Sequence, residues 1–507
     1  MNRSVGKGAM VLVISGLICK LFGAFFRLPL TNVLGIEGIA IFQMVMSLYS
    51  LAVIFVSNGI TSSLSKLVSS ARARGEIVKT GAYLKIAVKY VLWVGLSLGA
   101  ILAIFSKKIA LVQGFSGGSS YLLMLLLLPC GGLIGVYRGI IQGHENMTPT
   151  AVSQIIEQVS RFAFGLSLAY LFGRSGVNAG VFGAFLGISI SEALAFIYLQ
   201  FALSKNMKIQ HSDVVVKREF FSAVLPLSFS SAVIPLTHAV ESLVILPLLA
   251  VAGFERSIAQ KLYGLQTGMI GTILSFPLLV SLAVGMALLP KVSFLSSQGS
   301  KEEEKVTISR AFSLMWAFLV PLVLGVCAIS KEFYLLVYPT VIKDFLPISK
   351  GLTLVTAVAT LMAGIMQFLF SILQAKGLFK HALCFSLVGG GVKLLSLVIF
   401  ARLSAIGIYA IPISNALLNA TISICAMVKL YSTVKVDFFN LFLPLAGGTV
   451  MFLSVELMIS ALGGFVGIIL AVIAGGGVYG VLTLPLWLEF IKPLLGRFKK
   501  DKKRLEN

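Results

Sequence analysis

Charged residues are scarce in this sequence of 507 residues. Asp, Glu, Lys and Arg make up 12 % of the chain, whereas a soluble domain of this size carries about a quarter. Acidic residues are the rarer group, with 19 Asp and Glu against 41 Lys and Arg. The chain therefore has too few polar residues to cover the surface of a soluble domain of any size.

Cysteine and histidine are also sparse, with five and four residues respectively. The cysteines fall in apolar stretches without paired spacing, which favours small buried side chains over disulfides or metal ligands. The histidines are isolated, and we assign them no site. No Ser-His arrangement, carboxylate pair or phosphate-binding glycine loop is present, so we expect no enzyme, no cofactor and no direct use of ATP.

Long apolar runs fill the sequence instead. Hydrophobic residues make up 58 % of the chain, and the mean hydropathy is +0.99. A bilayer core of roughly 30 Å needs about 20 apolar residues per helix. Runs of that length recur throughout and predict an all-α integral membrane protein with about fourteen transmembrane helices. The stretches 39–70 and 262–297 are longer than one span needs, so we expect each to be a tilted helix. The first run lacks a cleavage pattern and is expected to be retained.

Lysine and arginine are concentrated in alternate loops. If the amino terminus is cytoplasmic, most of them fall on the cytoplasmic side, as the positive-inside rule requires. This bias predicts a multi-pass protein of the bacterial cytoplasmic membrane with both termini in the cytoplasm. The net charge of +22, including the basic run 499–504, then reflects topology and contact with anionic lipids. We therefore expect no nucleic-acid partner.

Some charged residues fall inside the apolar runs or at their rims. Groups at this depth normally face a protein interior or a wet cavity, because burying a charge in lipid costs at least about 2.5 kcal/mol. The excess is cationic, which favours an anionic passenger, and arginine suits phosphate oxygens in particular. The cations are Lys20, Arg27, Lys85, Lys89, Arg138, Arg161 and Lys393, and the acids are Glu157, Glu192, Glu241 and Glu456.

The strongest group of such residues lies between positions 138 and 161. Arg138 and Gln142 end one predicted helix with a polar face. Gln154, Glu157 and Arg161 share one face of the next helix, because they are separated by three, four or seven residues. We expect this face to look inward. Glu157 and Arg161 also form a favourable i, i+4 pair, so mutual neutralisation is an alternative to substrate binding.

Two cations near the amino terminus admit different readings. Lys20 lies deep in the first run, which favours a role in a cavity. Arg27 is predicted to end the first helix just before Pro29. The sequence is equally compatible with an Arg27 that anchors the helix at the membrane interface and with one that faces the cavity.

A weak internal repeat relates the two halves of the chain. Gln142 pairs with Gln374 and Arg161 with Lys393 at one constant offset. The repeat predicts two parallel six-helix lobes, at residues 1–210 and 211–435. Residues 436–492 then form two extra helices, and 493–507 form a basic cytoplasmic tail. Parallel repeats of this kind build transporters with a site between lobes that rock for alternating access.

Several motifs resemble those of a known family. The chain is similar to the polysaccharide biosynthesis proteins of the multidrug/oligosaccharidyl-lipid/polysaccharide exporter superfamily, and especially to their stage V sporulation protein B branch, which is related to the lipid II flippases. The motifs are Lys20-Leu21-Phe22-Gly23 with Arg27, Gly35-Ile36-Glu37-Gly38, residues 59–66, residues 69–75, Arg138-Gly139, Gln142-Gly143, Thr148-Pro149-Thr150 and residues 154–161.

The resemblance implies a V-shaped transporter of twelve helices plus two. It would flip an undecaprenyl-pyrophosphate-linked oligosaccharide or a lipid II-like peptidoglycan precursor for cell-wall, spore-cortex or surface polysaccharide synthesis. We expect a monomer without a metal site, and the coupling ion is left open. The residues expected to bind substrate are Lys20, Arg27, Arg138, Gln142, Gln154, Glu157, Arg161, Gln374 and Lys393.

Two alternatives come from other functional classes. A multidrug or cation antiporter of the same architecture would need a lone buried carboxylate with few cations near it. A non-transporting scaffold for envelope or spore assembly would need no charges facing a cavity. The positive sign of the embedded charge favours the flippase over both.

Overall fold

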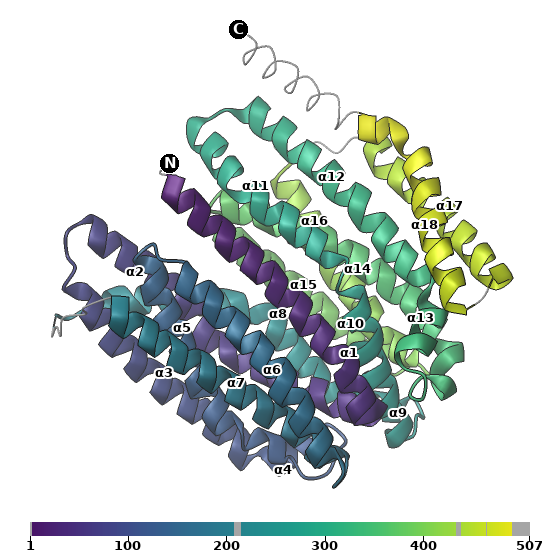
Figure 1. Cartoon of the computed structure of the whole chain (residues 1–507), viewed down its shortest axis with the longest axis horizontal. Coiled ribbons are helices and arrows are strands. Elements are labelled where there is room, and N and C mark those ends of the chain that lie inside the picture. The colour runs from purple at the N-terminus through teal and green to yellow at the C-terminus, as the bar shows by residue number, and fades with distance from the viewer. Residues whose placement is uncertain (1–2, 207–213, 432–437, 463, 489–507) are drawn as a thin grey trace. The chain divides into compact units, whose positions relative to one another are not determined.

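The computed structural model describes residues 3–206, 214–431, 438–462 and 464–488, and every regular element in these ranges is a helix (Figure 1). Within the described residues, thirteen helical runs are long and apolar enough to cross a membrane. The predicted class, an all-helical multi-pass membrane protein, is confirmed. The predicted basic tail at 493–507 and His211 lie outside the described residues.

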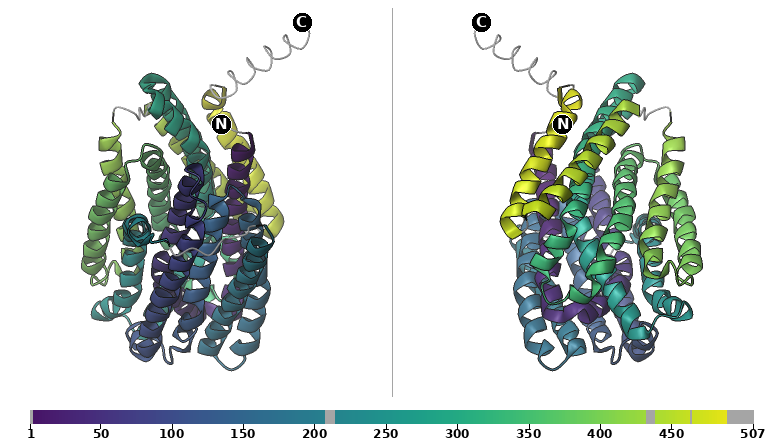
Figure 2. Two further views of the ribbon diagram at one scale, coloured as in Figure 1. Left: turned by 90° about the vertical axis from the view of Figure 1, so that its left-hand side faces the viewer. Right: turned by 90° about the vertical axis from the view of Figure 1, so that its right-hand side faces the viewer.

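Residue contacts divide the chain into two compact units, each built of long helices (Figures 1 and 2). The first unit comprises residues 1–276 and 383–421. Its elements are α1 (Arg3–Val53), η1 (Ile54–Asn58), α2 (Gly59–Ala73), α3 (Lys79–Ile104), α4 (Ser106–Val112), η2 (Ser119–Tyr121), α5 (Met124–Gly143), α6 (Thr148–Gly173), α7 (Val177–Asn206), α8 (Lys217–Val251), α9 (Arg256–Tyr263), η3 (Gly264–Ile270), α10 (Gly271–Leu274), most of α15 (Phe379–Phe400), η5 (Gly407–Tyr409) and the first part of α16 (Ala410–Lys429).

The second unit comprises residues 277–382 and 422–507. It therefore includes the beginning of α15 and the end of α16. Its other elements are α11 (Leu278–Gln298), α12 (Lys301–Ala328), α13 (Ser330–Val337), η4 (Lys343–Phe345), α14 (Leu346–Ala375), α17 (Phe438–Leu462) and α18 (Gly464–Leu482). These units follow packing contacts, whereas the predicted lobes follow the repeat, so the lobe boundaries stay a prediction.

The first helical run is interrupted at Gly35. Its φ of 71° and ψ of 179° belong to a region that essentially only glycine adopts. The candidate run Ser15–Ala73 has 59 residues, about 90 Å of helix, whereas one crossing needs roughly 30 Å. Figure 1 shows α1 leading away from the N-terminus before the chain returns toward α2. Counting this run as two crossings agrees with the predicted number of about fourteen.

Two details of the predicted helix boundaries are wrong. The first helix does not end just before Pro29 but continues through it to Gly35. The stretch 262–297 is not one tilted helix, because α10 ends at Leu274 and α11 begins at Leu278. The break precedes Pro277, which lacks a backbone N–H and disfavours helical geometry in the residue before it. The stretch 39–70, by contrast, is helical throughout, with the π-helical segment η1 inside it.

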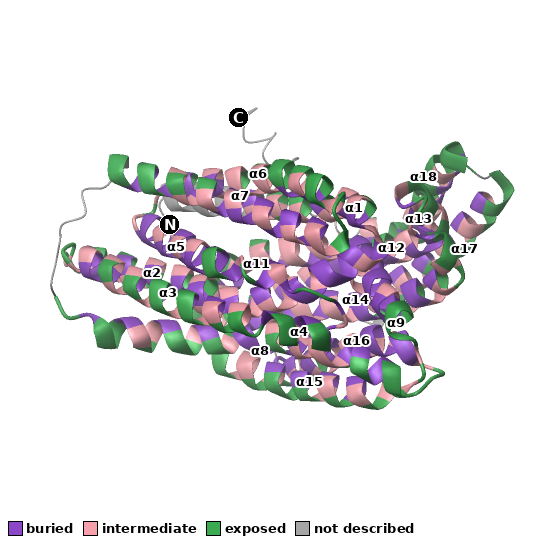
Figure 3. Ribbon diagram, turned by 90° about the horizontal axis from the view of Figure 1, so that it is seen from below, coloured by how far each residue is buried: buried purple, intermediate pink, exposed green. Residues whose placement is uncertain are grey.

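The helix α3 shows how these helices pack. Its buried face repeats every fourth residue and includes Gly95 and Gly99, which let α3 approach the backbone of α5. Its other face exposes large apolar side chains, and Trp93 is 70 % exposed. Figure 3 shows buried and exposed residues along the same helix. An exposed apolar face is what a lipid solvent favours, because lipid does not penalise it.

The second unit is tied together by aromatic side chains. The Trp316 indole on α12 donates a hydrogen bond of 3.0 Å to the Leu441 carbonyl on α17. The Tyr479 hydroxyl on α18 donates one of 2.7 Å to the Ala317 carbonyl on α12. The helices α17 and α18 also pack against each other. These contacts satisfy the polar ends of aromatic groups that are otherwise buried.

Candidate functional site

A carboxylate joins two arginines in the first unit. Glu157 lies on α6, and its Oε1 is 2.7 Å from Nη2 of Arg161, one turn further along. Its Oε2 accepts a hydrogen bond of 3.0 Å from Nη2 of Arg138 on α5. The three side chains are 14–15 % exposed. The structure thus brings together three of the predicted site residues, and it contains the predicted Glu157–Arg161 pair. We call these three residues the arginine cluster.

The start of α6 positions this cluster. The helix begins at Thr148, and Pro149 occupies its first turn, where a missing N–H costs nothing. The face that carries Gln154 looks toward α1, because the Ser15 hydroxyl donates a hydrogen bond of 3.0 Å to the Gln154 amide oxygen. The face carrying Gln154 and Glu157 therefore contacts α1 and α5, and the prediction that it looks inward agrees with these contacts.

A second carboxyl group lies near the arginine cluster without a cation of its own. Glu192 on α7 is 3 % exposed, and its Oε1 accepts a hydrogen bond from the Tyr49 hydroxyl on α1. Its Oε2 is buried and has no hydrogen-bond partner among the described residues. Arg161 lies within electrostatic range of both Glu192 and Tyr49. The sequence showed Glu192 at membrane depth but gave no sign of its tyrosine partner.

Lys393 has different partners. Its ammonium on α15 lies 2.7 Å from Oε2 of Glu241 and 2.9 Å from Nδ1 of His238, both on α8. Lys393 is fully buried, and Glu241 is 3 % exposed. A charged ammonium only donates, so Nδ1 of His238 accepts and its ring proton lies on Nε2. Sequence reasoning assigned no site to His238, although its i, i+3 spacing from Glu241 was a usable signal. The substrate-binding role of Lys393 stays a prediction.

The other predicted cations lie on the first part of α1. Lys20 is exposed, and Arg27 is partly buried within electrostatic range of Arg161. Neither side chain has an ion-pair partner in the part of the chain that the structure describes. Both are therefore compatible with binding an external anion, and their roles stay predictions.

The two predicted glutamines occupy matching places. Gln142 is the second-to-last residue of α5, and Gln374 is the second-to-last residue of α14. Gln142 is partly buried in the first unit, whereas Gln374 is exposed in the second. Gln374 lies in the second unit and the arginine cluster in the first, so a role of Gln374 in substrate binding stays a prediction.

An apolar groove runs along the part of α1 that carries Lys20 and Arg27. Its volume is about 540 Å³, and no polar surface lines it. One lining residue, Phe162, directly follows Arg161 in the sequence. The shape and chemistry suit a hydrocarbon chain. The lining residues are Ile18, Leu21, Phe22, Phe25, Leu28, Pro29 and Phe162.

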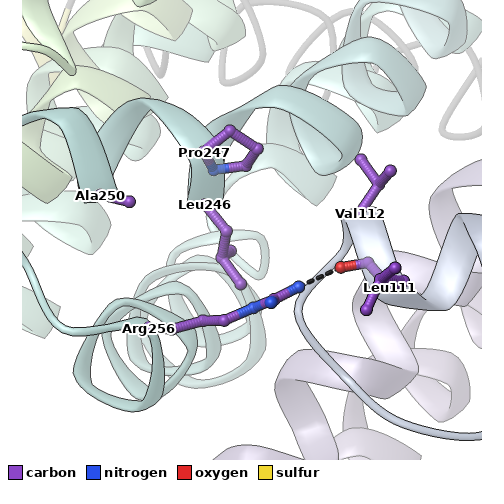
Figure 4. Close-up of a pocket in the computed structure, with 6 residues that line it drawn as sticks. All are labelled: Leu111, Val112, Leu246, Pro247, Ala250 and Arg256. Atoms are coloured by element: carbon purple, nitrogen blue, oxygen red, sulfur yellow. Dashed lines mark hydrogen bonds between the residues drawn. The ribbon is translucent and has the colours of Figure 1, made fainter.

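A further pocket of about 400 Å³ lies between α4, α8 and α9 (Figure 4). The Arg256 guanidinium crosses it and donates a hydrogen bond to the Leu111 carbonyl. None of the residues of the arginine cluster lines this pocket, so it is separate from the candidate site. Its lining residues are Leu111, Val112, Leu246, Pro247, Ala250 and Arg256.

Comparison with known proteins gives a family and a fold. A family model described as polysaccharide biosynthesis protein matches residues 5–296. The chain is 28 % identical over 298 residues to stage V sporulation protein B of Bacillus subtilis (strain 168), covering 57 % of this chain and 58 % of that protein. It is 23 % identical over 366 residues to lipid II flippase MurJ of the same organism, covering 67 % and 66 %. The chain thus matches less than two thirds of the length of these relatives.

Solved structures extend the likeness over nearly the whole chain. A lipid II flippase MurJ in an inward closed conformation aligns with a TM-score of 0.72 at 12 % identity, covering 94 % of this chain and 99 % of that one. An inward-facing multidrug resistance MATE family transporter aligns with a TM-score of 0.58 at 12 % identity, covering 90 % and 100 %. At this identity the alignments show a shared fold.

Proposed function

The chain belongs to the polysaccharide biosynthesis protein family, a family of membrane transporters rather than enzymes, and from this membership we propose that it is a lipid flippase. Its substrate is an undecaprenyl-pyrophosphate-linked oligosaccharide or a lipid II-like peptidoglycan precursor. The two relatives described as stage V sporulation protein B and as a lipid II flippase support this substrate class. The product serves cell-wall, spore-cortex or surface polysaccharide synthesis.

The arginine cluster is the observation that carries the proposal. Two guanidinium groups held by one carboxylate at membrane depth form a site with a net positive charge. Arginine pairs bind phosphate oxygens through several parallel hydrogen bonds, and a membrane interior strengthens each of them. Lys20 and Arg27 on α1 add positive charge for the second phosphate group of a pyrophosphate.

The apolar groove supports a lipid-linked rather than a free anion. It lies along the same part of α1 that carries Lys20 and Arg27. A prenyl chain near this groove leaves its pyrophosphate within reach of the cations. The remainder of the tail stays in the surrounding lipid.

Transport proceeds by alternating access between lobes at residues 1–210 and 211–435, with the chain acting as a monomer. In this proposal both termini lie in the cytoplasm. The distribution of lysine and arginine over the loops supports this orientation. Reporter fusions at either end, scored for cytoplasmic activity, test it.

The decisive experiment is complementation in cells that lack lipid II flippases. We expect the intact chain to restore growth, and we expect the double variant Lys20→Ala with Arg161→Ala to lose that rescue. Lys107→Ala, an exposed cation on α4, serves as the matched control and should rescue fully. Full rescue by the double variant at normal expression would contradict the role of these cations. Failure of the intact chain would contradict a lipid II-like substrate.

One observation favours a second candidate, a multidrug or cation antiporter. Glu192 is a buried carboxyl group without a cation at ion-pair distance among the described residues. Such a group suits the binding of a positive drug. Ethidium efflux from cells that express the chain, abolished by Glu192→Gln, would support this function over the flippase.

A further inference from the structure

The carboxylate of Glu157 bridges Arg138 and Arg161 in the way that the oxygens of a bound phosphate would. Each of its oxygens meets a different guanidinium group, at 3.0 Å from Arg138 and at 2.7 Å from Arg161. Arg138 is held in place by a second contact, because its Nε donates a hydrogen bond of 3.0 Å to the Ser153 hydroxyl. A carboxylate bridging two guanidinium groups has the same charge pattern as a phosphate group in that position.

The cluster also has unused hydrogen-bonding capacity. The Nε of Arg161 is buried and finds no acceptor in the described part of the chain. The Oε2 of Glu192, on a side chain only 3 % exposed, likewise finds no donor there. Buried polar atoms are normally satisfied, so an unmatched donor on the arginine indicates that the cluster is incomplete without a further acceptor.

We propose that Glu157 is a resident counter-anion that an incoming phosphodiester or pyrophosphate diester displaces, and that the displaced carboxyl group takes up one proton from solution. This inference rests on the anion site of the proposed function and adds a linked proton to it. The incoming anion provides oxygens for both guanidinium groups and for the free Nε of Arg161. Glu157 is then left beside a second negative charge and without its cations.

The electrostatics of the site explain the proton. A carboxylate that loses two cationic partners in a poorly hydrated site, and gains an anion next to it, is far more stable when neutral. No covalent bond forms or breaks: one anion enters, one proton leaves the solution, and that proton is bound by Glu157. The titratable and charged groups within electrostatic range of this carboxyl group are Arg161 on α6, Arg138 on α5, Cys19 and Tyr49 on α1, and Glu192 on α7.

The neighbouring Glu192 makes a second charge costly. With Glu157 displaced but still ionised, two carboxyl groups and the bound anion would share two arginines. Uptake of one proton removes one of these negative charges. Linkage then requires that binding strengthen as pH falls, by up to tenfold per pH unit while Glu157 is ionised in the free site and neutral in the complex.

Calorimetry on the purified full chain in lipid nanodiscs tests this. The probe is P1,P2-dimethyl pyrophosphate, whose two charges do not titrate near neutral pH. Titrations in Tris and in MOPS, which differ in ionisation enthalpy, give the number of protons taken up per anion bound. We expect a value approaching one for the unaltered chain, and the affinity should rise as pH falls.

Variants assign the proton. Glu157→Gln should bind the probe about tenfold more tightly at neutral pH, with no proton uptake and a flat pH dependence. Glu456→Gln, which changes an embedded acid of the second unit, should behave like the unaltered chain. If Glu157→Gln does not fold, the proton count of the unaltered chain still decides whether a proton is taken up, and Glu192→Gln decides whether Glu192 binds it.

The possible failures are distinguishable. If the unaltered chain does not bind the probe at any pH, the anion site of the proposed function is wrong. If it binds the probe without proton uptake, the resident counter-anion is overturned while the anion site stands. Proton uptake that survives in Glu157→Gln but is lost in Glu192→Gln overturns the assignment to Glu157.

Discussion

The ammonium of Lys393 and the carboxylate of Glu241 lie 2.7 Å apart, and neither side chain is more than 3 % exposed. Between them they join α15 to α8, where Gly390 also allows close approach to Thr237. Such a pair is costly to form, because both charges leave water, but it is far more costly to break on one side only. The two helices therefore depend on both charges being present.

We predict that replacing either Lys393 or Glu241 alone destabilises the protein strongly, and that replacing both destabilises it only a little. Lys393→Met or Glu241→Gln leaves an uncompensated buried charge and should lower the free energy of unfolding by about 3–5 kcal/mol. The double variant should lose much less. Reversible unfolding in mixed SDS micelles gives the three values. Lys350→Met, from a more exposed pair with Glu456, is the control and should cost less than about 1 kcal/mol. Additive losses in the double variant would contradict the pairing.

The turn at Gly35 gives a second prediction. A side chain at φ 71° and ψ 179° is strained, so Gly35→Ala should destabilise the protein by about 1–3 kcal/mol. The midpoint of thermal unfolding, followed by size-exclusion chromatography of the detergent-solubilised protein, should fall. Gly16→Ala, on the same helix, is the matched control, since an added Cβ meets nothing within 4 Å and the backbone is helical. Equal midpoints for the two variants would show that Gly35 does not need its unusual backbone angles.

The close contact between α3 and α5 gives a third prediction. A Cβ added at Gly99 would lie 2.7 Å from the Met124 carbonyl oxygen, which the backbone cannot accommodate without moving. Gly99→Val should therefore force the two helices apart and cost at least about 1–3 kcal/mol. Gly477→Val on α18, where an added Cβ meets nothing within 4 Å, should have little effect. Reversible unfolding in mixed SDS micelles compares the stabilities of the two variants. A Gly99→Val protein as stable as the unaltered chain would contradict the close packing.

The tryptophans give a fourth prediction, on exposure to lipid. Trp93 is 70 % exposed on α3, whereas Trp316 is 2 % exposed inside the second unit. In nanodiscs that contain brominated lipids, quenching of tryptophan fluorescence should decrease strongly in Trp93→Phe and hardly at all in Trp316→Phe. Unchanged quenching in Trp93→Phe would mean that this face of α3 is covered by protein rather than by lipid.

Much of the architecture follows from composition. Apolar runs of about 20 residues can only be membrane helices in a chain with so few charges. The prediction of about fourteen is close to the thirteen candidate runs of the described residues, one of which is long enough for two crossings. The errors in the predicted helix boundaries fall at two prolines, whose backbone lacks an N–H group. The sequence pattern cannot distinguish Pro29, which is tolerated inside α1, from Pro277, where the helix breaks, because neighbouring packing decides between a kink and a break.

The candidate site was predictable only where its residues share a helix. The spacing of Glu157 and Arg161 indicated their pair directly, since side chains four residues apart meet on one face. The contact of Glu157 with Arg138 depends on how α5 and α6 pack, and that of Lys393 with Glu241 joins helices far apart in the sequence. Contacts of this second kind have no periodic signal in a single sequence.

The backbone at Gly35 has a consequence for which compartment each loop faces. Counted as one crossing each, the thirteen runs of the described residues are an odd number, whereas two crossings for the run Ser15–Ala73 make the number even, as the proposed placement of both termini on one side requires. The parity of the crossings, on which the proposed placement of both termini depends, thus rests on one pair of backbone dihedral angles that glycine adopts because it lacks a Cβ.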